Sequence, residues 1–401
     1  MGAVTDANAA DPAPTQDSAG SAPTQGVAGT PDASLFPATR LEAARRAAQD
    51  AGLDALLIAP GADLRYLTGY QALPLERLTC LVVPAAGDPF LVVPELERAA
   101  AQASPAGRLG IGISGFGETD DAYAMIARRL PANTRLFAVD NHMWAEKLLA
   151  FQAALPTAQA GLAGDVLSVL RMRKTPAEIE ALRRAGAAID RVHRRMGEWL
   201  KAGRTEREVA KDIADAIIDA GHATVDFVIV GSGPNGASPH HEVSDRVIRA
   251  GDPVVVDIGG TTAEGYCSDS TRVYTVGEPP AAFREMYDVL LRAQTAQTGA
   301  VRPGITAEEL DAVGRDIIAA AGHGEHFIHR TGHGIGLETH EEPYIVAGSR
   351  RALEAGMAFS VEPGIYLPGM YGARIEDIAV CTEDGGERLN LTGRDLVVLP
   401  A

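Results

Sequence analysis

The chain has 401 residues, 46% of them hydrophobic and 22% charged, which is typical of a globular protein with enough apolar material for two or three domains. Its 36 basic and 53 acidic residues leave a net charge of −17, which argues against nucleic acid and anionic membranes as partners because both bind basic surfaces. Three scattered cysteines form no disulfide framework, and no run approaches the roughly 18 apolar residues of a membrane span. No signal-peptide pattern is visible, so we expect a cytoplasmic location by default.

The first 33 residues contain almost no large apolar side chain and are rich in Ala, Pro, Gly, Ser, Thr, Gln and Asp. Such a segment cannot bury enough area to offset its ordering entropy, so residues 1–33 are predicted to be a disordered tail. The alternative interpretation is an extended arm that lies on a neighbouring subunit.

Strand and helix patterns alternate over residues 34–163, which indicates an α/β domain. The expected strands lie at 54–58, 78–83, 90–93, 109–113 and 135–139. The expected helices lie at 40–51, 96–102, 121–130 and 144–155. The segment DLRYLTGY, residues 63–70, is predicted to be a turn that enters a strand.

A long helical connector is predicted to start the second region, residues 164–401. Thr175 suits the N-cap, Pro176 the first helical position and Glu178 the N3 position, so a helix is expected from 176 to about 201. Further helices are expected at 205–220, 281–298 and 306–321, and strands dominate from 225 onward.

The stretch VVVDIGGTTAEGYCSDSTR, residues 254–272, predicts a hairpin or adjacent strand pair in this second region. Such a pair of strands would bring two carboxylates, Asp257 and Asp269, close together. Two buried carboxylates repel each other, so either one of them is protonated or a cation binds between them.

Three downstream segments add an imidazole, two carboxylates and a guanidinium. They are TGHGIGL around His333, SVEPG around Glu362, and RIED with Arg374 and Glu376. Each segment alone has a plainer interpretation as a turn, a loop or, for Arg374 and Glu376 on one face of a strand, an exposed salt bridge. Their coincidence with the two aspartates is improbable by chance and points to a shared site.

The combined set carries four negative charges, which two divalent cations would balance. Its members are Asp257, Asp269, His333, Glu362 and Glu376. Oxygen ligands with one imidazole suit manganese, cobalt, zinc or iron better than an ion that prefers thiolates. Two such ions about 3.5–4 Å apart form an arrangement that activates water and polarises a carbonyl for hydrolysis.

These motifs resemble the creatinase or "pita-bread" metallopeptidase family, which includes methionine aminopeptidase, aminopeptidase P and prolidase. DLRYLTGY and the segment RKTPAEI at 173–179 are similar to the two-domain Xaa-Pro branch of that family. The resemblance implies an α/β N-terminal domain over 34–163 and an α+β pita-bread catalytic domain over 164–401. It also implies two divalent metal ions, with manganese preferred and cobalt or zinc as alternatives, and a homodimer.

The resemblance further assigns a role to each metal-site candidate. Asp257 would chelate one metal through both oxygens, and Asp269 and Glu376 would bridge the pair. His333 and Glu362 would complete the other metal, and Glu362 would also accept a proton from the attacking water.

Three more residues are implied to act beside the metals. His240 precedes Asp257 by 17 residues and is preferred to the adjacent His241 because of that spacing. His340, seven residues after His333, would hydrogen-bond the scissile carbonyl or the developing oxyanion. Arg374 would orient Glu376 or lie beside the substrate.

The implied reaction is hydrolysis of the Xaa-Pro bond, a tertiary amide without an N–H. Dipeptides, as for prolidase, are the preferred substrates, and longer peptides with proline at position two, as for aminopeptidase P, are the alternative. A metal-free creatinase-like hydrolase and an inactive binding homologue are further alternatives, both disfavoured by the intact ligand set.

Overall fold

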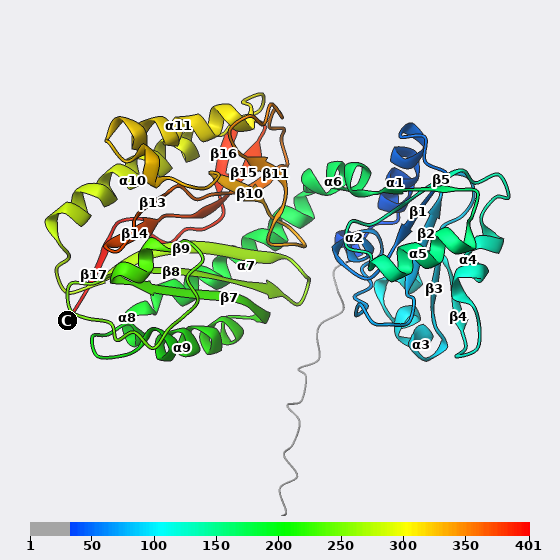
Figure 1. Ribbon diagram of the computed structural model, residues 1–401, viewed down its shortest axis with the longest axis horizontal. Helices are drawn as coiled ribbons and strands as arrows, with labels where there is room; N and C mark the ends of the chain where they lie inside the picture. The colour runs from blue at the N-terminus through cyan, green and yellow to red at the C-terminus, as the bar shows by residue number, and fades with distance from the viewer. Residues whose placement is uncertain (1–32) are drawn as a thin grey trace, which may run out of the picture. The chain divides into compact units, whose positions relative to one another are not determined.

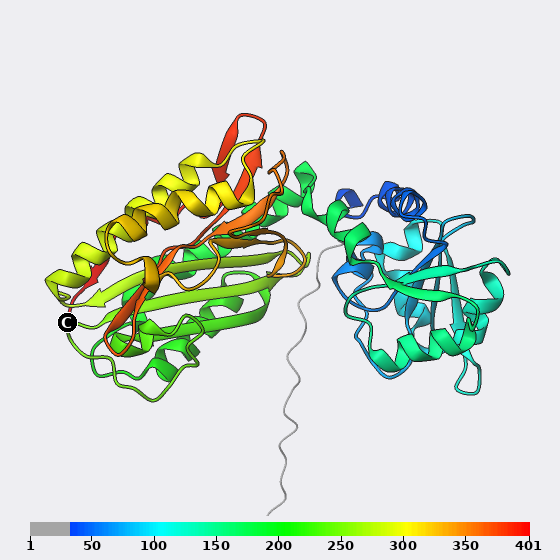
Figure 2. The ribbon, with the colours of Figure 1, turned by 45° about the horizontal axis from the view of Figure 1, so that its top comes forward.

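The computed structural model describes residues 33–401. The predicted tail lies outside these residues, except for Ala33, which opens a short 3-10 helix, η1 (Ala33–Leu35). Figures 1 and 2 show the described part from two directions. No helix within residues 33–401 combines the length and the apolar character needed to cross a membrane.

The first region is built on a mixed six-stranded sheet with the order β4-β3-β2-β1-β5-β6. Its strands are β1 (Ala55–Ile58), β2 (Cys80–Pro84), β3 (Phe90–Pro94), β4 (Gly112–Phe116), β5 (Leu136–Val139) and β6 (Gln159–Leu162). The helices are α1 (Thr39–Asp50), α2 (Ala62–Thr68), α3 (Glu95–Ala103), η2 (Pro105–Arg108), α4 (Ala122–Arg129) and α5 (Ala145–Ala154). Strands β1, β2 and β3 pair antiparallel, whereas β4, β5 and β6 each join in parallel.

The central strands are apolar at every position because both faces of this sheet are covered. Leu56 and Ile58 of β1 pack with residues of α1 and α2, whereas Ala55 and Leu57 pack with residues of α4 and α5. Because side chains alternate along a strand, β1 contributes residues to two separate hydrophobic cores.

The prediction for residues 63–70 was wrong, because this segment is the helix α2 rather than a turn entering a strand. Leu64 and Leu67, three positions apart, are both fully buried on one face of the helix. Gly69 ends the helix with φ 71°, a left-handed conformation that glycine adopts without strain. A seven-residue helix has too few turns for its period to stand out in the sequence.

The second region contains the remaining helices, and three of them begin with the same signal. They are α6 (Gly164–Met172), α7 (Pro176–Arg194), α8 (Met196–Trp199), α9 (Glu206–Asp219), α10 (Ala281–Ala300) and α11 (Ala307–Ala320), with 3-10 turns η3 (Gly233–Ala237) and η4 (Gly324–His326). Helices α7, α9 and α11 start with complete capping boxes at Thr175, Thr205 and Thr306. The helix predicted from 176 to 201 is interrupted at Arg195, which separates α7 from α8.

Two sheets and a hairpin form the rest of this region, in the orders β17-β9-β8-β7, β11-β10-β12-β15-β16 and β13-β14. Their bounds are β7 (His222–Ser232), β8 (Pro253–Thr262), β9 (Cys267–Val276), β10 (Gly332–Gly334), β11 (Glu341–Ile345), β12 (Ala358–Val361), β13 (Gly364–Leu367), β14 (Tyr371–Arg374), β15 (Asp377–Thr382), β16 (Gly385–Arg388) and β17 (Val397–Leu399). In Figure 1, α10 and α11 lie above these strands and α8 and α9 lie below them.

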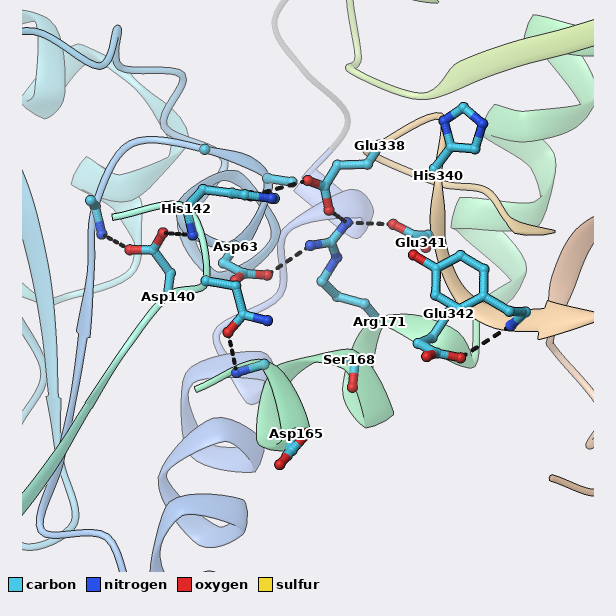
Figure 3. Close-up of a pocket in the computed structure, with 16 residues that line it drawn as sticks. Asp63, Asp140, His142, Asp165, Ser168, Arg171, Glu338, His340, Glu341 and Glu342 are labelled. Atoms are coloured by element: carbon cyan, nitrogen blue, oxygen red, sulfur yellow. Dashed lines mark hydrogen bonds and ion pairs between the residues drawn. The ribbon is translucent and has the colours of Figure 1, made fainter. Parts of the chain in front are cut away.

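A buried ionic network joins α6 to α2 and to the loop before β11. We call it the Arg171 junction, and its members are Asp63, Arg171, Lys174, Glu338 and Glu341. Arg171 reaches Asp63 at 2.8 Å and Glu338 at 2.7 Å, and both Arg171 and Lys174 pair with Glu341. Figure 3 shows Asp63, Arg171, Glu338 and Glu341 of this network, which line a cavity of about 290 Å³.

Candidate active site

The hairpin of β8 and β9 presents two aspartates on the same face of one sheet. Gly259 of β8 is the direct partner of Asp269, and Asp257 lies two residues before Gly259. Side chains two residues apart on a strand share a face, so Asp257 and Asp269 are diagonal neighbours. Val256 and Ile258 occupy the opposite face, where they pack with α7 and α9. The hairpin prediction is therefore confirmed.

The second sheet brings the remaining carboxylates to the ends of two paired strands. Val361, the last residue of β12, pairs with Asp377, the first residue of β15. Glu362 immediately follows this pair and Glu376 immediately precedes it, so both leave the sheet at one edge. His333 lies in β10, which pairs with β12.

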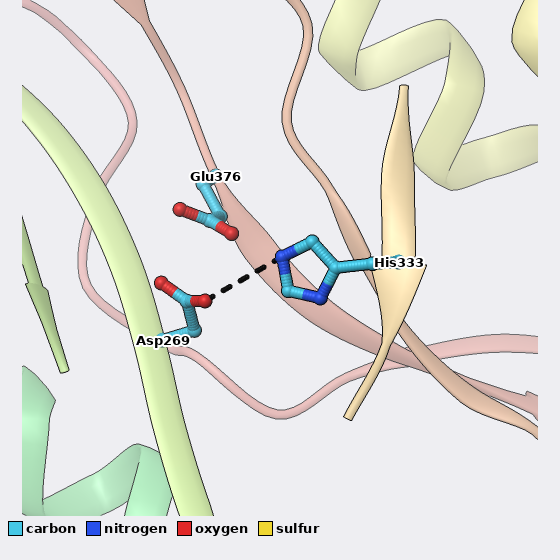
Figure 4. A group of neighbouring side chains, drawn as sticks. All are labelled: Asp269, His333 and Glu376. Carbon is cyan, nitrogen blue, oxygen red and sulfur yellow. Dashed lines mark ion pairs between the residues drawn. The ribbon is translucent and has the colours of Figure 1, made fainter. Parts of the chain in front are cut away.

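All five predicted ligands line one cavity of about 760 Å³. His333 Nε2 lies 3.2 Å from Glu362 Oε1 and 3.6 Å from Asp269 Oδ2. Ligand atoms of Asp269, His333 and Glu376 all lie within 4.8 Å of one another, as Figure 4 shows. We call Asp257, Asp269, Glu362 and Glu376, together with His333, the carboxylate cluster.

The carboxylate cluster holds more negative charge than nearby side chains neutralise. Burial raises the pKa of Asp269 and of Glu376 well above the usual range, and the neighbouring carboxylates raise both further. Asp257 Oδ1 and Glu376 Oε1 are buried without a hydrogen-bond partner among the described residues. Orphaned carboxylate oxygens on a cavity that an imidazole also lines are the donor set that divalent cations require, so these residues fit the implied metals.

His333 is oriented so that one ring nitrogen faces the carboxylates. Its Nδ1 donates to the carbonyl oxygen of Gly334 at 3.1 Å. A carbonyl only accepts, so Nδ1 carries the proton and Nε2 keeps its lone pair for a metal.

Arg374 lines the cavity and contacts two members of the carboxylate cluster in different ways. Its Nη2 pairs directly with Asp257, and its Nε donates to Thr271 Oγ1 at 3.1 Å. Thr271 Oγ1 in turn donates to Glu376 Oε2 at 2.7 Å, so Arg374 reaches Glu376 only through this hydroxyl. The expectation that Arg374 and Glu376 share one strand was wrong, because β14 ends at Arg374 and β15 begins after Glu376.

The two candidate catalytic histidines line the same cavity as the carboxylate cluster. The His340 ring lies 4.0 Å from the His333 ring, between centroids, and it lines the smaller cavity beside the Arg171 junction as well. Burial, together with the nearby His333, lowers the pKa of His340 to about 4, which keeps the ring neutral near pH 7. His240 lines the cavity, whereas His241 turns away and donates from Nε2 to Glu206 Oε2 at 2.8 Å.

Sequence reasoning missed several residues at this site. Phe227, Ile229 and Ile328 give the cavity an apolar wall, but no local pattern distinguishes them from other apolar residues of strands and loops. His329, which was not among the predicted site residues, also lines the cavity. Its Nε2 lies 2.9 Å from the hydroxyl of Tyr366, to which Arg374 Nη1 donates at 2.8 Å.

Comparison with known proteins places these features in a family. The model of metallopeptidase family M24 matches residues 180–383, and the model of the creatinase/prolidase N-terminal domain matches residues 40–173. The chain is 54% identical over 369 residues to the probable dipeptidase PepE of Mycobacterium tuberculosis, covering 92% of this chain and 98% of that one. It is 39% identical over 365 residues to an Xaa-Pro dipeptidase of Lactobacillus helveticus, with 88% and 96% covered.

The structural comparison agrees. A crystal structure of dipeptidase PepE from Mycobacterium ulcerans matches with a TM-score of 0.88 and 53% identity, covering 93% of this chain and all of that one, 100%. These matches confirm the predicted fold class, a creatinase-type N-terminal domain plus a pita-bread catalytic domain. The chain therefore belongs to metallopeptidase family M24.

Proposed function

We propose that this metallopeptidase hydrolyses the Xaa-Pro bond of dipeptides with the help of two divalent metal ions. The observation that carries the proposal is the carboxylate cluster, in which five residues from four separate segments converge on one cavity with orphaned buried oxygens. The relatives named as dipeptidases support the substrate class.

The proposed ligands are Asp257, Asp269, His333, Glu362 and Glu376. Bound there, the ions would supply a nucleophile from water near neutral pH and would polarise the scissile carbonyl. We propose manganese as the resident ion, with cobalt or zinc as alternatives.

The chain's own residues would handle protons and orientation. Glu362 Oε1 accepts from Ser360 Oγ at 3.0 Å and faces His333, whereas Oε2, which lies 3.9 Å from Arg374 Nε, would take a proton from the attacking water. His340 is neutral and sits beside His333, where its N–H can donate to the carbonyl oxygen as negative charge develops there. Arg374 would hold Asp257 in place through their ion pair. His240 would contact the substrate from the loop between η3 and β8.

The preference for proline rests on the relative named as an Xaa-Pro dipeptidase, and the proposed site is compatible with it. An Xaa-Pro bond offers a carbonyl but no N–H, and the proposed groups act on the carbonyl alone. A cavity of about 760 Å³ has room for a dipeptide and lies in the usual size range of ligand pockets. Aminopeptidase P activity on longer peptides is the alternative, because the same groups would serve it.

We also propose an oligomeric state, a location and a domain division for this protein. We propose a homodimer located in the cytoplasm, with the chain divided into residues 34–163 and residues 164–401. Light scattering on the purified protein would test the dimer, and expression of residues 164–401 alone would test the division.

The test of function compares substrates on protein stripped with a chelator and then supplied with manganese, cobalt or zinc. We expect Xaa-Pro dipeptides to be cleaved faster than Xaa-Pro tripeptides, and both only after metal is restored. Faster cleavage of the tripeptides would favour aminopeptidase P activity instead. Turnover of a guanidino compound by the stripped protein would favour the creatinase-like alternative, and the absence of any turnover would favour a binding homologue.

A further inference from the structure

Glu206 is a fully buried carboxylate that the proposed mechanism does not use. It is the first residue of α9, and its side chain points into the loop between β7 and β8. Burial raises its pKa, but hydrogen bonds from Ser244 and Ser232 outweigh that effect, so the pKa is lowered and the carboxylate is charged.

Four residues of this loop donate hydrogen bonds to Glu206, and we call them and Glu206 the Glu206 cluster. Oε1 accepts from the backbone N–H of Ser232 at 2.8 Å, its hydroxyl at 2.7 Å and the Asn235 amide at 3.0 Å. Oε2 accepts from His241 at 2.8 Å and from Ser244 Oγ at 2.6 Å. One side chain thus ties together the end of β7, η3 and the segment after His240.

His240 depends on this anchoring because its own side chain is exposed and forms no hydrogen bond or ion pair with any residue of 33–401. Its place in the cavity is therefore set by its backbone neighbours. On one side, the carbonyl oxygen of Pro239 accepts from Arg374 Nη1 at 3.3 Å. On the other side, His241 is held by Glu206.

We infer that Glu206 is a positioning residue that holds His240 in the substrate cleft through His241 and the rest of the Glu206 cluster. This inference rests on the proposed function for its kinetic consequence. Its structural consequence, an anchored loop at 232–244, stands independently of any activity.

Substitution of Glu206 by glutamine would test this with little change in volume. Each carboxylate oxygen accepts from a backbone N–H, which can only donate: Oε1 from Ser232 at 2.8 Å and Oε2 from Ser244 at 3.2 Å. Either orientation of the amide therefore places an NH₂ against one of these donors. The loop should loosen and His240 should lose its fixed position. We expect kcat/KM on an Xaa-Pro dipeptide to fall on the order of 10- to 100-fold, as misplacement of a substrate-positioning group does.

Glu178→Gln provides a matched control, since Glu178 is another buried carboxylate near a helix start. It pairs with Arg40 at 2.9 Å and accepts from Tyr266 at 3.0 Å, and it does not line the substrate cavity. We expect Glu178→Gln to lower stability while kcat/KM per folded molecule stays within about twofold of wild type, since it leaves the positioned groups in place.

A double-substitution cycle separates positioning from a general structural effect. If Glu206 acts through His240, Glu206→Gln should cost little further activity in a His240→Ala background. An equal fold loss in both backgrounds, or full activity of Glu206→Gln, would overturn the inference.

Hydrogen–deuterium exchange gives a readout that does not depend on activity. Exchange over 232–244 should quicken in Glu206→Gln and stay unchanged in Glu178→Gln. Unchanged exchange in Glu206→Gln would refute the anchoring. If wild-type protein fails to cleave Xaa-Pro dipeptides while this exchange pattern holds, the proposed function fails and the anchoring stands.

Discussion

The Arg171 junction and the carboxylate cluster both bury carboxylates, but they differ in how far side-chain cations neutralise the negative charge. In the junction, burial raises the pKa of Glu341, but Lys174 and Arg171 outweigh it, so the pKa is lowered. In the cluster, burial and mutual repulsion leave the pKa of Asp269 and of Glu376 raised. Lys174 and Arg171 pair with Glu341, whereas no lysine or arginine within residues 33–401 pairs with Asp269 or Glu376, where we propose that metal ions bind.

The two sites therefore affect the stability of the folded chain differently. A buried carboxylate without a cation lowers the free energy of unfolding, and a ligand that binds only the folded chain can offset this loss. A buried carboxylate paired within the chain is a fixed part of the fold. Removing a carboxylate should therefore affect activity and metal content in the cluster, and stability in the junction.

The largest effect is expected for Asp269→Ala. Loss of residues that merely support metal ligands costs about 10- to 100-fold in metal affinity or activity, so loss of a proposed ligand itself should cost more than 100-fold in kcat/KM. Stability without metal should fall little or even rise, because one of the repelling charges is gone. Steady-state kinetics and chemical denaturation of the stripped protein check both statements, and undiminished turnover would contradict the proposed site.

Glu341→Gln should lower the stability of the fold and leave the metal content unchanged. Lys174 is nearly inaccessible, with a side-chain exposure of 1%, and the substitution would remove the charge of its carboxylate partner. Removing one member of a buried ion pair costs about 3–5 kcal/mol, and we expect the free energy of unfolding to fall by that order. Denaturant titration at fixed metal concentration measures it. A metal content unchanged from wild type would show that the loss belongs to the junction.

Arg374→Lys tests the exception to this difference, because Arg374 is the one buried lysine or arginine within residues 33–401 that forms ion pairs with the carboxylate cluster. It pairs with Asp257 and lies 3.9 Å from Glu362. Lysine keeps the charge but cannot contact Asp257, Thr271 and Tyr366 together. We expect kcat/KM to fall about 10- to 100-fold, as for other supporting residues at metal sites. Full activity would show that charge alone suffices there.

Thr271→Val should have the smallest effect. It removes the hydroxyl that donates to Glu376 and accepts from Arg374 but keeps the shape of the side chain. A hydrogen bond to a charged group contributes about 1.5–3 kcal/mol, which sets an upper bound of roughly 10- to 100-fold on the activity loss. Thr271→Ser restores the hydroxyl and should recover most of kcat/KM, and failure of this rescue would point to packing instead.

The hairpin and the helix starts could be predicted from the sequence because their signals are local. A β-branched run before Asp257 marked β8, and Thr-x-x-Glu marked the start of α7 at Thr175. The helix α2 was missed because its burial, not its short sequence, distinguishes it.

The candidate ligands were found through the spacing of motifs in a resembling family, but their partners were not. Arg171 and Glu341 are separated by 170 residues, and nothing in either neighbourhood points to the other. Thr271 and Glu206 likewise have ordinary local sequences, as an interior strand residue and a helix-start residue. Their importance arises only when distant segments fold together.

The metal content of the purified protein tests the central claim most directly. Elemental analysis of wild-type protein reconstituted with manganese and freed of excess metal should give two ions per chain, and Asp269→Ala should hold fewer. Glu341→Gln should still hold two. A wild-type protein that retains no divalent metal, or an Asp269→Ala protein that retains both ions, would contradict the account.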